Sequence, residues 1–424
     1  MKNTLIIISF LSVASINVVA QSGWFSQTSG TGYSLQSVKF LDHNTGWAVG
    51  QHAGANRCII IKTSNGGSDW NVQYTDSINN LYSVFFIDMN TGWTVGGSPQ
   101  IILKTTNGGI NWIRQYSETT RNLRSVLFVN PDTGWTVGWN DLILKTTNGG
   151  TNWTIQASAI GAFVSYLNSV YFIIENTGWA VSGYMRGNIQ KTTNGGVNWF
   201  FQIDYLSNGL NSVWFNDENT GWTVGDQGVI LKTTNGGSNW INQINLFPSF
   251  LYSVQFINNN TGWAVSGYSY SVLQKTTNGG TNWIYEFNPS GVNNFLRSVF
   301  FIDENTGWTV GDQGTILKTT NGGTIITGIQ SVSSELPSEY NLSQNFPNPF
   351  NPKTHFKFGI IAPGVVSLKV YNVLGNEIET LVNENLTPGV YDVDFDGSNF
   401  PSGIYFYKLK TGFFSETKRM ILLK

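Results

Sequence analysis

Short apolar runs recur along most of the chain, separated by turns rich in glycine and asparagine. One unit reads L-x-S-V-x-F, then N-T-G-W-x-V, then I-L-K-T-T, and finally N-G-G-x-N-W-x-x-Q. Each run is short, contains β-branched or aromatic residues, and is bounded by turn-forming residues, as is typical of β-strands. The pattern therefore predicts an all-β chain built from units of four strands.

The unit occurs seven times. Its Thr-Gly-Trp tripeptide recurs at intervals of 41 to 46 residues, and an Asn-Gly-Gly turn follows it in every copy. A period of about 40 to 45 residues with four strands is typical of a propeller blade. Because a closed ring needs no capping repeats, seven copies predict a seven-bladed β-propeller. The repeated tryptophans are Trp47, Trp93, Trp135, Trp179, Trp222, Trp263 and Trp308.

The two ends of the repeat region complement each other. Six Asn-Gly-Gly turns lead to a strand with tryptophan, whereas the seventh, at Asn321, leads to a stretch without one. Residues 23–27, Gly-Trp-Phe-Ser-Gln, carry the missing W-x-x-Q pattern before the first unit. We expect this N-terminal strand to complete the last blade and to remove an exposed sheet edge. The predicted propeller spans residues 21–325.

The first 20 residues have the features of a secretory signal peptide. Lys2 precedes an apolar stretch from Leu5 to Ala20, and small residues stand just before Gln21. A membrane anchor is the alternative, but the stretch is shorter than the roughly 20 residues that a membrane-spanning helix needs. We expect cleavage of residues 1–20, after which no transmembrane segment remains.

Composition narrows the choice of partners. Charged residues make up 11% of the chain and the net charge is −2, so no basic field would attract nucleic acid. One cysteine and three histidines offer neither an internal disulfide nor a cysteine-rich zinc site. We expect no metal, no cofactor, and a monomer.

Loop geometry separates the two faces of the predicted propeller. In an antiparallel blade, the loops after the first and third strands emerge on one face, and here they are the nearly constant N-T-G and N-G-G turns. The loops after the second and fourth strands differ between blades, and we call the face that they form the variable face. Function is expected on such loops. The candidate ligand-binding residues there are Trp139, Asp141, Tyr184, Arg186, Tyr268 and Tyr270.

These aromatic and charged side chains would suit a protein or a glycan ligand. The alternative is that they only cover the ends of the blades. Two repeated charged positions also have two interpretations each. Aspartates before the Thr-Gly-Trp motif (Asp42, Asp88, Asp217 and Asp303) suit turns, or else calcium loops. The lysines that end each third strand suit a ring of positive charge, or else solvated or acid-paired side chains.

The turn before each outer tryptophan resembles a known family motif. Residues 146–153, Thr-Thr-Asn-Gly-Gly-Thr-Asn-Trp, follow the Asp-box pattern S-x-D-x-G-x-T-W of BNR-type sialidase repeats, with Thr for Ser and Asn for Asp. Residues 23–325 as a whole more closely resemble the propellers of the photosystem II stability and assembly factor family. This resemblance implies the fold, and we do not extend the photosynthetic role to this chain.

Catalysis has little support in the sequence. A sialidase needs an arginine triad and a tyrosine nucleophile with a neighbouring glutamate, and the few propeller arginines do not match that pattern. Other glycosidases need two carboxylates about 5–10 Å apart, but Asp141, Asp226 and Asp312 belong to blades that are not neighbours. We therefore assign no catalytic residues and favour a macromolecule-binding protein. An extracellular glycoside hydrolase of an Asp-box-bearing class, or a purely structural or adhesive protein, is the alternative.

A different kind of sequence follows the repeats. Residues 326–337 read as a linker, and residues 338–424 contain five strand-like runs separated by turns. Three prolines between Pro347 and Pro352 exclude a helix at the entry. The pattern predicts a small antiparallel β-sandwich.

This C-terminal region closely resembles the type A sorting domain of the type IX secretion system. The matching stretches are N-F-P-N-P-F-N-P from Asn345, V-Y-N-V-L-G from Val370, P-G-V-Y from Pro388, S-G-I-Y-F-Y from Ser402 and T-K-R-M from Thr417. The resemblance implies contact with the secretion machinery and export through the periplasm and outer membrane, to the cell surface or the medium. Its motif residues here are Pro347, Pro349, Gly375, Gly389, Gly403, Tyr405 and Lys418.

Overall fold

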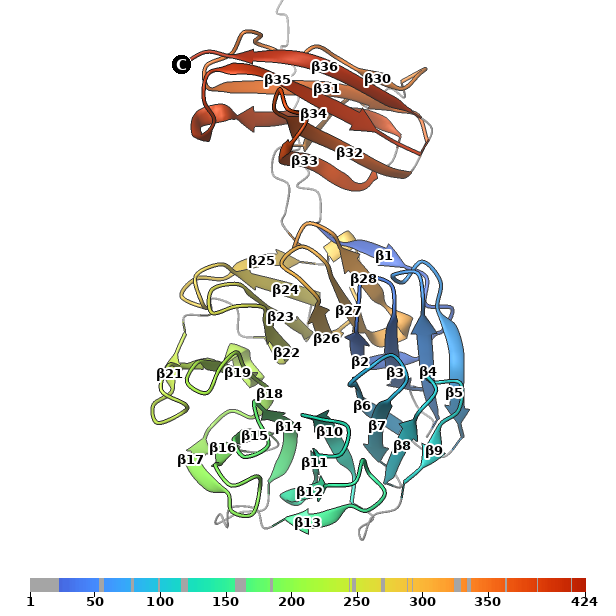
Figure 1. Cartoon of the computed structure of the whole chain (residues 1–424), viewed down its shortest axis with the longest axis vertical. Helices are drawn as coiled ribbons and strands as arrows, with labels where there is room; N and C mark the ends of the chain where they lie inside the picture. The colour runs from blue at the N-terminus through green and yellow to red at the C-terminus, as the bar shows by residue number, and fades with distance from the viewer. Residues whose placement is uncertain are drawn as a thin grey trace, which may run out of the picture. The chain divides into compact units, whose positions relative to one another are not determined.

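The chain forms two compact units, Ser22–Thr324 and Ile325–Lys424, in a computed structural model (Figure 1). The structure describes residues 23–52, 57–77, 80–97, 100–115, 121–156, 165–183, 186–243, 245, 249–267, 271–287, 289–291, 293–323, 329–333, 337–362, 364–386, 388–412 and 414–424. The signal-peptide prediction for residues 1–20 lies outside these ranges. Among the described residues, no helix combines the length and apolar character of a membrane span.

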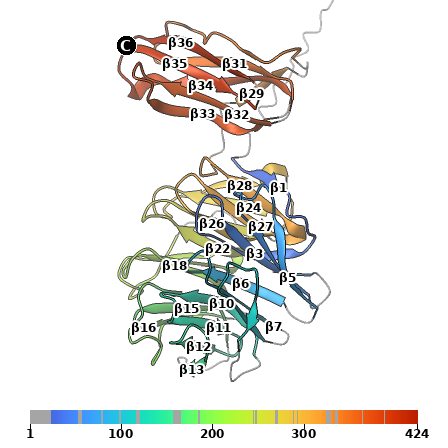
Figure 2. The ribbon, with the colours of Figure 1, turned by 45° about the vertical axis from the view of Figure 1, so that its right-hand side comes forward.

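The first unit contains seven four-stranded antiparallel sheets arranged as blades around a common axis, which confirms the predicted propeller (Figures 1 and 2). Within each blade, the first strand is innermost. The first three blades comprise β2 (Ser34–Phe40), β3 (Gly46–Gln51), β4 (Cys58–Thr63) and β5 (Asn71–Asp76); β6 (Asn80–Phe86), β7 (Gly92–Gly97), β8 (Ile101–Thr105) and β9 (Ile113–Arg114); β10 (Leu123–Phe128), β11 (Gly134–Gly138), β12 (Leu142–Thr146) and β13 (Thr154–Gln156).

The next three blades repeat the same strand order, each sheet following the chain from the axis outward. They comprise β14 (Tyr166–Phe172), β15 (Gly178–Gly183), β16 (Gly187–Thr192) and β17 (Phe200–Leu206); β18 (Leu210–Phe215), β19 (Gly221–Gly225), β20 (Ile230–Thr233) and β21 (Ile241–Asn242); β22 (Leu251–Phe256), β23 (Gly262–Gly267), β24 (Ser271–Thr276) and β25 (Ile284–Phe287).

The seventh blade joins both ends of the repeat region. It consists of β26 (Leu296–Phe301), β27 (Gly307–Gly311), β28 (Ile316–Thr319) and the N-terminal strand β1 (Phe25–Gln27). β1 pairs antiparallel with β28, and Phe25 stands opposite Lys318. Trp24 is buried just before β1 and packs edge-on against Phe301, 5.6 Å between ring centroids. The N-terminal strand therefore supplies the tryptophan that the seventh turn lacks.

Neighbouring blades are joined by the tryptophan of Thr-Gly-Trp. Trp47 stacks on Phe86 of the next blade with 3.6 Å between ring centroids, and its Nε1 donates a hydrogen bond of 3.2 Å to the Gly108 carbonyl of that blade. All seven blades repeat both contacts, with ring separations of 3.5–3.6 Å and hydrogen bonds of 2.9–3.3 Å. Trp308 closes the circle on Phe40 and Gly66.

The same phenylalanine explains the glycine of the motif. A Cβ on Gly46 would lie 2.6 Å from the Phe40 ring, and the corresponding glycine of every other blade meets its own phenylalanine at 2.5–2.6 Å. Within each blade, this phenylalanine also contacts the edge of the tryptophan at the outer strand, as Phe40 does with Trp70 at 5.9 Å. The glycine, the phenylalanine and both tryptophans thus pack closely together. Any side chain at the glycine position would collide with the phenylalanine ring.

The repeated lysines reinforce this contact. Lys62 Nζ lies 5.0 Å from the centroid of the Trp47 ring and donates a 2.9 Å hydrogen bond to the Gly108 carbonyl. The lysine of each blade lies over its own tryptophan at 5.0–5.6 Å. Burial lowers the pKa of these ammonium groups below its usual range. Each lysine therefore makes a cation–π contact with the tryptophan of its own blade, which neither interpretation from the sequence anticipated.

The innermost strands contact one another through serine hydroxyls. Val84 N donates 3.3 Å to Ser37 Oγ of the preceding blade, and the equivalent bond forms at all seven junctions. Two residues beyond Ser37 on β2, Lys39 lies between Phe85 and Phe300, 5.3 and 4.6 Å from their ring centroids. Burial lowers the pKa of Lys39 to about 8. This lysine therefore carries its charge in an aromatic environment.

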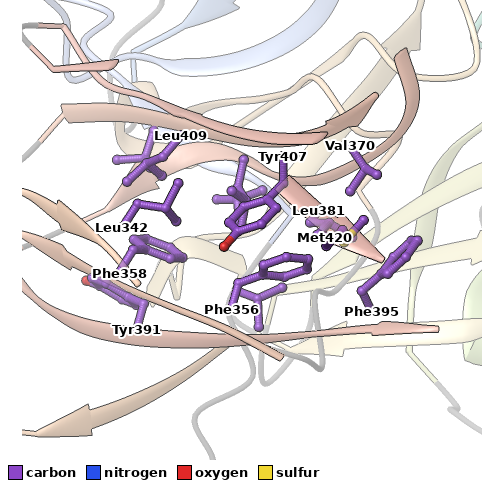
Figure 3. Close-up of a cluster of buried hydrophobic side chains, with 14 of the residues drawn as sticks. Leu342, Phe356, Phe358, Val370, Leu381, Tyr391, Phe395, Tyr407, Leu409 and Met420 are labelled. Carbon is purple, nitrogen blue, oxygen red and sulfur yellow. The ribbon is translucent and has the colours of Figure 1, made fainter. Parts of the chain in front are cut away.

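The second unit is a sandwich of two four-stranded sheets, β29-β34-β31-β30 and β33-β32-β35-β36. Its aromatic core includes Phe356, Tyr407 and Phe395, with ring centroids of Phe356 and Tyr407 4.4 Å apart (Figure 3). The strands are β29 (Ile329–Ser333), β30 (Asn341–Leu342), β31 (Lys353–Ile360), β32 (Gly364–Tyr371), β33 (Glu377–Leu386), β34 (Gly389–Asp396), β35 (Gly403–Lys410) and β36 (Ser415–Leu422).

The prediction of a linker over residues 326–337 was wrong in its middle. Residues 329–333 form β29, which pairs with β34 through partners such as Ile329 and Val393. The segment is short and polar, but β34 offers it an edge for main-chain hydrogen bonds, which the composition of the segment does not reveal. The sandwich therefore begins before residue 338.

Trp24 provides a test of ring closure. Replacing this buried side chain in Trp24→Ala removes its contact with Phe301, and we expect a loss of about 3–5 kcal/mol in the free energy of unfolding. Urea unfolding of the chain from residue 21 would measure the loss. Ser26→Ala on the same strand is exposed and should change stability by less than about 0.5 kcal/mol. Equal stability of Trp24→Ala and Ser26→Ala would contradict closure by β1.

Lys39 makes stability depend on pH. Because its folded-state pKa is lowered, the unfolded chain binds more protons between pH 8 and 10.5, so this group adds stability as the pH rises through that range. Lys39→Met should therefore stabilise the propeller at pH 7 by roughly 1–3 kcal/mol, and the gain should shrink toward pH 10.5. Parallel urea titrations of both proteins would measure it, and a gain independent of pH would refute the buried charge.

Candidate ligand-binding site on the variable face

The constant turns are fully engaged in structural contacts. Gly66 N donates 2.8 Å to the Asn44 carbonyl, so the N-G-G and N-T-G turns of a blade meet on one face. Asp42 accepts hydrogen bonds from the backbone N–H groups of Asn44 and Thr45, and Asp88, Asp217 and Asp303 do the same in their blades. These aspartates shape turns. No group of three His, Cys, Asp or Glu side chains in the described ranges could hold a metal ion.

At the variable face, two blades share a repeated polar pair. The second residue of the innermost strand bonds to the first residue of the loop between the second and third strands. In the seventh blade, Arg297 Nε and Nη2 each donate 3.0 Å to the carboxylate of Asp312. In the fifth blade, Asn211 Nδ2 donates 2.9 Å to Asp226 Oδ1. Each aspartate is thus occupied by a polar partner from its own blade.

The third blade breaks this pairing. Arg124 stands at the position of Arg297, but the acid is replaced by Trp139, whose ring lies 5.8 Å from the Arg124 guanidinium carbon. Tyr82 of the preceding blade lies closer, at 4.3 Å. Trp139 itself stacks on Tyr166 with 4.9 Å between ring centroids. The arginine is therefore bordered by aromatic rings instead of a carboxylate.

The loop backbone shows that the two positions correspond. Asn140 and Asp141 have φ of 58° and 54°, and Gln313 and Gly314 have φ of 56° and 72°. Asp141 N donates 2.9 Å to the Ser165 carbonyl, just as Gly314 N donates 2.7 Å to Tyr33. The same turn is therefore kept in both blades. The side chain that faces the arginine differs, as do the two that follow it, which are Asn140 and Asp141 in place of Gln313 and Gly314.

Arg124 lacks a counter-ion in the described part of the chain. Its Nε is buried without a hydrogen-bond partner, and the ion pairs of the described residues do not include it. Burial lowers the pKa of the guanidinium, whereas Tyr82 and Tyr166 act in the opposite direction. Since an arginine remains protonated in proteins, a positive charge is held at this position.

The predicted binding residues do not form one cluster in the described ranges. Asp141 accepts hydrogen bonds from the Ser165 hydroxyl and from Ser165 N, the latter 3.0 Å long. Burial raises the pKa of Asp141, and these hydrogen bonds oppose the rise. Arg186 lies over Tyr205 of the outer strand β17 at 5.1 Å, whereas Trp139 contacts inner-strand residues. Tyr184, Tyr268 and Tyr270 lie outside the described residues.

The sequence interpretation therefore missed Arg124, Tyr82 and Tyr166. The available signal was the departure of Gly138-Trp139-Asn140 from the Gly-Asp-Gln pattern at Asp226 and Asp312. The three acids once considered for glycoside hydrolysis, Asp141, Asp226 and Asp312, are bonded to Ser165, Asn211 and Arg297 respectively.

The sorting-motif residues of the second unit differ in their exposure to solvent. Gly389 and Tyr405 are buried, and the Tyr405 hydroxyl donates 2.7 Å to the Pro401 carbonyl. Lys418 is half-buried and pairs with Glu416 at 3.2 Å. Gly375 has φ of 79° in the turn between β32 and β33. The exposed members are Pro347, Pro349, Gly375 and Gly403.

Two family models match the chain. "Photosynthesis system II assembly factor YCF48" matches residues 16–118, and "Secretion system C-terminal sorting domain" matches residues 344–423. The second match supports export by the type IX secretion system, to the outer cell surface or the extracellular space. None of the curated proteins compared with the chain matches it significantly.

Solved propellers are similar in fold. "YCF48 bound to D1 peptide" is 22% identical, with a TM-score of 0.59 over 72% of this chain and 100% of that one. "YCF48 from Cyanidioschyzon merolae" is 20% identical, with a TM-score of 0.57 over 71% and 98%. The WD40 propeller of Doa1 is 12% identical, with a TM-score of 0.56 over 71% and 96%. The chain therefore combines a propeller that is similar in fold to YCF48, and that matches the assembly factor model over residues 16–118, with a match to the secretion system C-terminal sorting domain over residues 344–423.

Proposed function

We propose that the exported propeller binds a macromolecule, a protein or a glycan, through its variable face. The observation that carries the proposal is the contrast between the faces. On the constant face, turn amides, tryptophans and lysines are used in contacts within and between blades. On the variable face, Arg124 retains a charge beside Trp139, and none of the described residues supplies its counter-ion. A charged group next to aromatic rings is typical of a binding surface.

A binding role also fits the similar propellers. One of them, a YCF48 propeller, is described as bound to a peptide, which supports a ligand-binding surface on this fold. A hydrolase has less support, because each of Asp141, Asp226 and Asp312 is engaged by a partner within the fold. A glycosidase would need two carboxylates positioned on opposite sides of a glycosidic bond.

Blocking each face in turn would test the proposal. His52→Cys places an exposed thiol in a variable-face loop, and Asn90→Cys places one in a constant turn on the opposite face. After coupling of a 5-kDa polyethylene glycol maleimide, the two proteins are applied to panels of polysaccharides and surface proteins. We expect a retained ligand to be lost only from the His52→Cys conjugate, because the polymer shields that face. Native Cys58 is buried and should not react.

The same panels, assayed for new reducing ends, separate binding from hydrolysis. We expect retention without release of ends. Release that disappears in Asp141→Asn would favour a glycoside hydrolase. Equal loss of retention in both conjugates would contradict a binding role for the variable face.

For export, we propose that the secretion machinery contacts the exposed turn between β32 and β33. Leu374 at this turn is 81% exposed, and Val373 beside it is 65% exposed. Buried motif residues such as Tyr405 serve the fold instead. Exposed apolar side chains at one turn are suited to contact with a partner.

Two variants distinguish recognition from folding. Leu374→Ser should leave thermal stability unchanged but lower the exported fraction several-fold, because it removes only exposed apolar surface. Tyr405→Phe, which removes the hydroxyl bonded to Pro401, should cost about 0.5–1.5 kcal/mol of stability with export preserved. Cell fractionation and thermal melting give the two readouts. Normal export of Leu374→Ser would rule out this turn as a contact.

A further inference from the structure

The third blade lacks the acid that the seventh blade supplies to its arginine. Asp312 binds Arg297 in a bidentate ion pair, whereas Trp139 stands at the corresponding loop position beside Arg124. The two turns share their positive φ values and main-chain bonds, and the side chain that faces the arginine changes from a carboxylate to an indole. In the described part of the chain Arg124 has no carboxylate partner, and a planar guanidinium in that state is suited to a carboxylate from a ligand.

The surroundings of Arg124 favour a particular kind of carboxylate. The Arg124 guanidinium carbon lies 4.3 Å from the centroid of the Tyr82 ring and 5.8 Å from that of Trp139, which stacks on Tyr166. These rings orient the arginine and add flat apolar surface next to the charge. A ligand with an ionised carboxylate on a compact ring body therefore matches the site.

Main-chain pairing with a peptide has little opportunity here. Peptides that add to a sheet use free backbone donors along a strand. Next to Arg124, Val126 N already donates to Ser83 Oγ at 3.2 Å, and Ser125 Oγ accepts from Val170 N at 3.3 Å. The innermost strand thus offers a ligand the charge and the aromatic rings of its side chains, but few free backbone groups. A sugar acid can bind to such side chains, whereas an extended peptide needs the backbone groups.

We propose that Arg124 binds the carboxylate of a uronic acid in an anionic polysaccharide, with Trp139 bordering the sugar. This inference rests on the proposed binding function and names its ligand class. The carboxylate serves as the counter-ion of Arg124, as Asp312 does for Arg297. No covalent step is involved, and the charge of the ligand is recognised through hydrogen bonds from the guanidinium.

The test uses the chain from residue 21 to its last residue and three defined probes, the trimers of galacturonate, glucuronate and mannuronate. Isothermal titration calorimetry measures the affinity of the chain for each acid trimer and for its neutral methyl ester. We expect at least one acid to bind and its ester to bind about 10- to 100-fold more weakly. Arg124→Gln should lose affinity by a similar factor. Arg297→Gln, the matched control at the same repeat position, should stay within about twofold because its charge is already paired.

A second pair of variants tests the missing acid directly. Trp139→Asp and Trp139→Asn both remove the ring, but only the aspartate supplies a counter-ion to Arg124. We expect the aspartate variant to bind the acid trimer about tenfold more weakly than the asparagine variant. Equal affinities would overturn the proposal even if both variants bind less well than the original chain.

The remaining outcomes are also decisive. Failure of all three acid trimers to bind would overturn the assignment of a sugar acid, as would binding of free-acid peptides that depends on Arg124. A macromolecule retained by the variable face with an affinity unaffected by Arg124→Gln would refute this site while leaving the proposed function intact. Loss of retention from both polyethylene glycol conjugates would instead count against the proposed function itself.

Discussion

The propeller depends on the contact between each Thr-Gly-Trp tryptophan and the next blade. The ring stacks at 3.5–3.6 Å on a phenylalanine whose other contacts are the motif glycine and the outer tryptophan of its own blade. The indole N–H, satisfied by a glycine carbonyl, avoids the cost of a buried donor without a partner. Because this contact repeats around the ring, each blade is held by both of its neighbours. The last blade is also completed by the N-terminal strand β1.

This use of the repeat determines where function can lie. The residues that make the interblade contact also fix the constant turns, so a change there would cost stability. The variable-face loops do not make this interblade contact, and their sequences differ between blades. In two blades the aspartate of such a loop bonds to a polar side chain of the innermost strand, Asp312 to Arg297 and Asp226 to Asn211. Arg124 beside Trp139 departs from that pattern without disturbing the turn.

Much of this architecture could be predicted from the sequence. The spacing of Thr-Gly-Trp gave the blade number, and the missing tryptophan after Asn321 indicated the role of Trp24. Such features repeat, so each copy supports the others. β29 could not be predicted, because its pairing depends on a free edge of β34 far along the chain. The lysine–tryptophan contacts and the environment of Arg124 could not be predicted from the sequence either, since they involve side chains from different strands or blades.

The state of Arg124 can be measured directly in solution. In protein labelled with ¹⁵N-arginine, the Nε–H signals of Arg124 and Arg297 can be assigned by Arg124→Gln and Arg297→Gln and followed as sodium galacturonate is added. The account predicts that the Arg124 signal shifts with saturation while the Arg297 signal, held by Asp312, stays in place. An unmoved Arg124 signal, or equal shifts of both, would contradict the claim that one arginine on the variable face is kept open for an anionic ligand.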